Sequence, residues 1–171
     1  MLRKRAPRAK LTEAQAADSG AALAAAVSAL AQRDYCSGEL RTRLTTLGYT
    51  AEAVDTAVCD LLERRYLDDG RYAQQYVSYH AERGQGPMRI SHELRQLGLS
   101  EALIDGALDQ YAQEHGDWGR LAREVRIRRF GLAQPLSWAQ KSKQARFLQY
   151  RGFSTDHIRS ALGQDVLGEA D

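Results

Sequence analysis

Cysteine, proline and long apolar runs are scarce in this 171-residue sequence, and each scarcity excludes a class of protein. The two cysteines, Cys36 and Cys59, stand apart without Cys-x-x-Cys spacing, which excludes a disulfide framework and argues against a structural zinc site. No apolar run reaches the ~20 residues that a membrane-spanning helix needs, so we expect no membrane partner. Only three prolines occur, and valine and isoleucine are sparse beside alanine and leucine, which predicts helices rather than an all-β fold.

A recognisable catalytic, metal or cofactor motif is also missing. The four histidines are scattered, and none has an evident carboxylate or nucleophile partner in the sequence. The glycine-rich stretch at 84–87 follows a predicted helix and lacks the Lys-Ser/Thr pair of a phosphate loop, so we interpret it as a helix end followed by a first-turn proline. The pair Asp68-Asp69 is interpreted as a helix cap with a first-turn acid, not as a metal site. We therefore predict that the protein is not an enzyme and has no catalytic residue, metal or cofactor.

The N-terminal region resembles a secretion signal only superficially. A basic start at 3–10 precedes an alanine-rich run that ends Ala-Leu-Ala at 29–31, as a signal peptide with its cleavage site would. Two acids, Glu13 and Asp18, interrupt the approach, and alanine is only weakly apolar. We therefore predict a cytoplasmic protein.

A repeat of about fifty residues organises the chain. In three segments, a glycine is followed by an apolar residue and then by serine or threonine; the glycines are Gly48, Gly98 and Gly152. Such a glycine closes a helix in the left-handed conformation, and the hydroxyl residue two positions later caps the next helix. Apolar side chains recur at helical spacing before and after each turn, although the third copy is the most degenerate.

A further helix precedes each helix pair. Asp68 and Asp117 are positioned to cap two of these helices, and the alanine-rich residues 21–33 fill the same place in the first copy. The sequence therefore predicts an all-α fold of three tandem three-helix repeats that form an elongated, curved array. The expected parts are a flexible basic N-terminal tail at 1–18, repeats at 19–66, 67–116 and 117–165, and an acidic C-terminal tail at 166–171.

The net charge of +2 conceals a strong local asymmetry. Residues 67–116 carry four basic and eight acidic side chains (−4), whereas residues 117–159 carry ten basic and three acidic ones (+7). Nine bases lie between positions 120 and 151, opposed only by Glu124; they are Arg120, Arg123, Arg126, Arg128, Arg129, Lys141, Lys143, Arg146 and Arg151. We predict that this basic cluster contacts phosphates or an acidic protein surface, the alternative being a solvated helix face.

Three tyrosines, Tyr72, Tyr76 and Tyr79, recur at helical spacing in the second repeat. This spacing is typical of a buried core stripe, and we interpret them so. Stacking on nucleic-acid bases is the alternative, and it requires exposed rings.

Four stretches of the chain together resemble a known family. They are RDYCSGELRTRL at 33–44, RYLDDGRYAQQYV at 65–77, RGQGPMRISHELRQLG at 83–98, and FLQYRGFS at 147–154 with Ile158. The central stretches combine an acidic cap, an aromatic helix and Gly-x-Gly-Pro punctuation in one order. Over about residues 20–165 the chain resembles the bacterial regulatory protein family RecX.

The resemblance implies a modulator of the RecA recombinase that lies in the groove of the RecA–DNA filament. Such a protein limits filament growth or promotes disassembly, and so reduces ATP hydrolysis, strand exchange and LexA cleavage in DNA repair and the SOS response. The implied partners are the RecA filament and the single-stranded and double-stranded DNA mainly within it, with a monomer favoured. The family supplies no catalytic residues, and Tyr35, Asp68, Tyr72, Gly86 and Pro87 match its pattern as fold-determining residues.

Two other functions are open at this point. The helix-turn-helix hairpins and the basic cluster are consistent with a stand-alone, non-specific nucleic-acid-binding module, although no repeat has an evident recognition helix with base-reading residues. A purely structural repeat scaffold is the other alternative.

Overall fold

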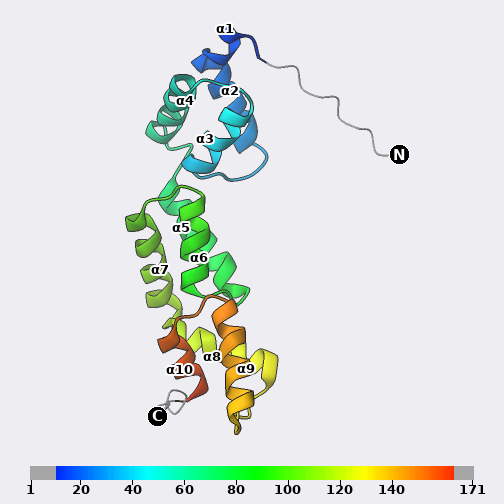
Figure 1. The fold of residues 1–171 in the computed structure, drawn as a ribbon. Coiled ribbons are helices and arrows are strands. Elements are labelled where there is room, and N and C mark those ends of the chain that lie inside the picture. Colours follow the sequence, from blue (N-terminus) through cyan, green and yellow to red (C-terminus); the bar gives the residue numbers. More distant parts are fainter. Residues whose placement is uncertain (1–10, 164–171) are drawn as a thin grey trace, which may run out of the picture. The chain divides into compact units, whose positions relative to one another are not determined.

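The computed structural model describes residues 11–163 and divides into two compact units, Met1–Asp69 and Gly70–Asp171. The described part contains ten α-helices and no strand (Figure 1). The prediction of an all-α fold built from three-helix repeats is therefore confirmed.

The first unit packs three helices around an apolar core. They are α2 (Ser19–Leu30), α3 (Ser37–Thr46) and α4 (Ala51–Glu63). Asp18 and Thr50 cap α2 and α4 by accepting the N–H groups of Ala21 (3.0 Å) and Ala53 (3.3 Å). The carboxylate of Asp69 accepts both the backbone N–H (2.7 Å) and the hydroxyl (2.5 Å) of Ser37, and so fixes the start of α3. Buried core side chains include Ala26, Leu40, Leu44, Val58 and Leu61.

Part of the expected flexible N-terminal tail, residues 11–18, is described by the structure and contains a helix. Residues 11–18 include a short helix, α1 (Glu13–Ala16), which begins with a reciprocal capping box between Thr12 and Gln15. The backbone N–H of Thr50 donates to the carbonyl of Ala16 at 2.8 Å, and this bond ties α1 to the start of α4. The rest of that tail and the acidic C-terminal tail at 166–171 lie outside the described residues.

The second and third repeats follow the same plan. Their helices are α5 (Asp69–Glu82), α6 (Pro87–Gln96), α7 (Glu101–His115), α8 (Trp118–Phe130), α9 (Trp138–Tyr150) and α10 (Thr155–Leu162). Asp117 caps α8 by accepting the N–H of Arg120 at 2.8 Å, as predicted. In the third repeat, α8 packs on α10, and the core includes Leu148, Phe153 and Ile158.

The tyrosines of α5 are not the core stripe that their spacing suggested. The buried face of this helix consists of Ala73, Val77 and Ala81, while Tyr79 is exposed. The tyrosines and these small residues both recur at helical spacing. The small residues form the buried face because they allow the neighbouring helices to approach more closely.

The turn at 84–87 connects α5 to α6 and forms hydrogen bonds with the third repeat. Gly84 has φ +78°, Gly86 is the cap position of α6, and Pro87 begins that helix, which confirms the expected punctuation. The N–H groups of Gly86 and Met88 donate to the first two carbonyls after α9, those of Arg151 (2.8 Å) and Gly152 (3.1 Å). The amino end of α6 thus satisfies the carboxyl end of α9, with favourable alignment of their dipoles.

Candidate functional site

The basic cluster lies on α8 and α9, two helices that are connected by the loop 131–137. Ser137 begins α9 by accepting the N–H of Gln140 at 3.3 Å. On their inner faces, Ala122, Val125 and Leu148 join the core of the third repeat, which fixes the outward direction of the polar faces.

Some of the nine basic residues predicted to make contacts are exposed and form no ion pair within residues 11–163. Lys143 and Arg146 lie on the exposed face of α9, and Arg128 and Arg129 are exposed near the end of α8. None of these four takes part in an ion pair within residues 11–163. Lys141, in the first turn of α9, is half-buried.

Others of the nine are engaged in contacts within the protein. Arg120 pairs with Glu124 at 3.0 Å. Arg123 donates to the carbonyl of Ser160 on α10 at 3.2 Å. Arg151 is half-buried at the junction described above and donates to the carbonyl of Arg83 at 2.9 Å. These contacts give the three residues structural roles, although their exposed atoms still contribute positive potential.

Arg126 does not belong to the surface, and its prediction as a contact residue is wrong. Only 1% of it is exposed. Its guanidinium donates to the carbonyls of Ala133 (3.0 Å) and Leu132 (3.4 Å) and to Oε1 of Gln144 (3.4 Å), while its Nε has no partner within the described residues. Burial lowers the pKa of Arg126, and the charge of Arg123 adds to this effect. The residue therefore holds the α8–α9 loop from inside.

The loop that Arg126 holds presents large apolar side chains to solvent. Leu136 is 92% exposed, Leu132 is also exposed, and Trp138 at the start of α9 is 70% exposed. These residues were not among the predicted contacts, although a tryptophan followed by two lysines within five positions is the basic and aromatic interleaving typical of nucleic-acid surfaces. Tyr150, exposed at the end of α9, shares one face with Lys143 and Arg146 because they are spaced i, i+3 and i+7.

The described residues hold no arrangement for metal chemistry. Within 11–163, no three His, Cys, Asp or Glu side chains come close enough together to hold a metal ion. None of the helices between those positions combines the length and apolar character that crossing a bilayer requires.

Comparisons with known proteins point to one family. The match to "RecX, second three-helix domain" covers residues 68–108, and the match to "RecX, third three-helix domain" covers residues 120–162. "Regulatory protein RecX" of Halorhodospira halophila is 41% identical over 151 residues, which are 88% of this chain and 91% of that protein. "Regulatory protein RecX" of Vibrio vulnificus is 38% identical over 141 residues, which are 82% and 90% of the two chains.

Solved structures agree on the fold. A crystal structure of regulatory protein RecX superposes with a TM-score of 0.70 at 25% identity, covering 84% of this chain and 70% of that one. The crystal structure of RecX from Lactobacillus salivarius gives a TM-score of 0.72 at 20% identity and covers 87% and 96% of the two chains.

Proposed function

The chain belongs to the RecX family of regulatory proteins, and on that premise we propose that it is a non-enzymatic negative regulator of the RecA recombinase. In this proposal it binds in the groove of the RecA–DNA filament in the cytoplasm and blocks filament extension. Inhibition of ATP hydrolysis, strand exchange and LexA cleavage follows, and the protein would act in DNA repair and the SOS response.

One observation assigns the proposed contact to a particular surface of this chain, the exposed face of α9. Lys143 and Arg146 are exposed on one face of α9, and neither is neutralised by a carboxylate within residues 11–163. Such cations gain free energy by replacing the condensed counterions of a phosphate backbone. No chemical step is needed, since selective binding to an inhibited filament shifts the equilibrium toward that filament by the difference in affinity.

We expect Lys143→Glu/Arg146→Glu to require about tenfold more protein for half-inhibition of the RecA ATPase on single-stranded DNA. Each reversal removes an attraction to phosphate and adds a repulsion. Both positions are exposed, so the thermal midpoint should stay within about 2 °C of the wild type.

A matched control places the same change in charge in the first unit. Arg43 and Arg65 are exposed there, and Arg43→Glu/Arg65→Glu should inhibit nearly as well as the wild type. Equal losses in the two variants would show that bulk charge, and not the α9 face, controls inhibition. If the wild-type protein fails to inhibit at stoichiometric ratios, the proposed function is wrong.

A second candidate function is a stand-alone, non-specific nucleic-acid-binding module, and the exposed ring of Trp138 favours it. The ring lies on α9, which also carries Lys141 and Lys143, so a single strand could stack a base on it while its phosphates meet the lysines. Tight DNA binding without any effect on RecA would support this candidate over the first.

Trp138→Ala should weaken binding to single-stranded DNA about tenfold, because stacking on an aromatic ring contributes ~1–3 kcal/mol per base. Fluorescence anisotropy with a labelled oligonucleotide measures it. Leu136→Ala is the control, since Leu136 is equally outward-facing but has no ring, and its affinity should change less than twofold. An unchanged affinity in Trp138→Ala would remove the tryptophan from the DNA contact.

A further inference from the structure

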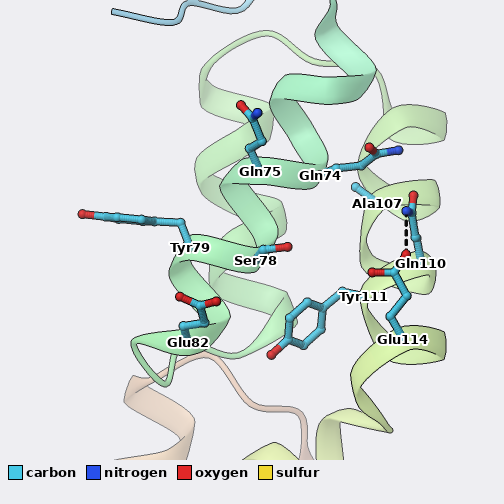
Figure 2. A pocket seen from close by; sticks show the side chains of 9 residues that line it. All are labelled: Gln74, Gln75, Ser78, Tyr79, Glu82, Ala107, Gln110, Tyr111 and Glu114. Carbon is cyan, nitrogen blue, oxygen red and sulfur yellow. Dashed lines mark hydrogen bonds between the residues drawn. The ribbon is translucent and has the colours of Figure 1, made fainter.

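A polar groove runs between α5 and α7 of the second repeat, and all the residues that line it belong to these two helices (Figure 2). Its volume is about 440 Å³, within the range of small-ligand sites. Six of the side chains that line it carry the argument: Ser78, Tyr79 and Glu82 from α5, and Gln110, Tyr111 and Glu114 from α7. Glutamines and glutamates dominate the lining, so the groove suits a polar ligand rather than an apolar one.

The charge of the groove is negative. Glu82 on α5 and Glu114 on α7 place one carboxylate on each wall, and no lysine or arginine lines the space. The amide of Gln110 donates to Glu114 at 2.8 Å, which orients that carboxylate. Arg83, which directly follows α5, lies over the ring of Tyr79 at 3.4 Å from its centroid and donates to the carbonyl of that residue, so it is already engaged at the rim.

The hydroxyl of Tyr111 is an independent sign of a ligand. Only 8% of Tyr111 is exposed, and its ring is stacked between His115 (centroids 4.5 Å apart) and Trp118 (4.8 Å). Figure 2 shows the ring reaching from α7 into the space between the helices, with its hydroxyl on the side of Glu82. Among the described residues, none forms a hydrogen bond with this hydroxyl. Within residues 11–163 the fully buried polar atoms without a partner are elsewhere, so this hydroxyl reaches the water of the groove, where a bound donor would pair with it.

The hydrogen-bond acceptors that line the groove select the kind of ligand. Carboxylates, amide oxygens and a phenol oxygen all accept hydrogen bonds, and a guanidinium or ammonium group supplies several donors and the opposite charge. A divalent metal fits less well, because no three acidic, histidine or cysteine side chains within residues 11–163 gather to hold one.

We propose that the groove between α5 and α7 binds an arginine or lysine side chain that the protein component of the RecA filament presents. This inference rests on the proposed function and adds a second contact to it. The basic helices of the third repeat meet phosphate, and the acidic second repeat meets a basic protein surface.

The first test compares two charge-matched variants of the full-length protein. Glu82→Gln/Glu114→Gln should weaken binding to the RecA filament about tenfold, because two charge-assisted hydrogen bonds become neutral. Asp105→Asn/Asp109→Asn removes the same charge from exposed positions of α7 that do not line the groove, and it should change the affinity less than twofold. Binding to DNA alone should be unaffected in both variants.

The second test removes the hydroxyl alone. Tyr111→Phe keeps the stacked ring, so the thermal midpoint should not fall, while filament affinity should drop about fivefold. A merely structural hydroxyl would lower the midpoint and leave the affinity unchanged.

The outcomes separate the two proposals. If the wild type does not bind or inhibit the filament, the proposed function fails. If the wild type binds and Glu82→Gln/Glu114→Gln binds equally well, the groove is not the contact and only the inference fails. Equal weakening by the Asp105→Asn/Asp109→Asn control would also overturn it, since it would assign the effect to the overall charge of the repeat.

Discussion

Gly86→Ala is expected to destabilise the second unit by about 3–5 kcal/mol, the sum of overpacking and two weakened hydrogen bonds. A Cβ at this position would lie 2.4 Å from the carbonyl carbon and oxygen of Gly152 and 2.5 Å from the backbone nitrogen of Phe153. These are backbone atoms of the turn between α9 and α10, which cannot rotate away as a flexible side chain would. The ends of α6 and α9 must therefore separate.

Separation breaks the contact that couples two repeats. The bonds from the N–H groups of Gly86 and Met88 to the carbonyls of Arg151 and Gly152 would lengthen or be lost. In a repeat protein, stability is the sum of the repeats and of the interfaces between neighbours, so a weakened interface also lowers cooperativity. We expect both a lower denaturation midpoint and a smaller slope of the unfolding free energy against denaturant.

Gly106→Ala is the matched control for this substitution. Gly106 lies inside α7, and a Cβ there meets nothing within 4 Å. Alanine at an open position inside a helix should stabilise the protein by ~0.5–1 kcal/mol. Similar midpoints for Gly86→Ala and the wild type in urea denaturation would contradict the junction described here.

Local backbone chemistry made most of the fold predictable. Gly48, Gly98 and Gly152 all adopt positive φ values, at 99°, 85° and 90°, because the left-handed turn that ends a helix favours glycine at that position. Thr50 caps the helix that follows the first of these turns, as expected. Ser100 takes the cap position of α7 without a side-chain hydrogen bond, which shows that the turn geometry persists where one of its bonds is missing.

Long-range packing decided what could not be predicted. Arg126 is buried because carbonyls of the loop 131–137 and the amide of Gln144 surround it, and no spacing along α8 reports where that loop will lie. The groove beside Tyr111 depends on α5 and α7 facing each other, so residues about thirty positions apart in sequence, such as Glu82 and Glu114, become its walls. Helical periodicity predicts which faces are apolar, but it does not say which polar side chains those faces will enclose.

Arg126→Ala is expected to lower the unfolding free energy by about 3 kcal/mol, through a cavity and orphaned carbonyl groups. Truncation leaves the carbonyls of Leu132 and Ala133 without their donor and empties the space of the largest fully buried side chain. Thermal unfolding followed by circular dichroism measures the loss. Arg128→Ala, two positions along the same helix but exposed, should stay within ~0.5 kcal/mol of the wild type.

A third variant separates packing from hydrogen bonding at this site. Arg126→Met keeps most of the buried volume and removes the charge, whose burial is unfavourable because no carboxylate within residues 11–163 pairs with it. We therefore expect Arg126→Met to lower the unfolding free energy less than Arg126→Ala does. The difference between the two variants measures the contribution of the cavity. Since Arg126 acts by holding the loop 131–137 that leads into α9, where Trp138 lies, both variants should weaken DNA binding only as far as that loop loosens. If DNA affinity instead fell as much as in Lys143→Glu/Arg146→Glu while stability stayed unchanged, Arg126 would have to contact the DNA directly.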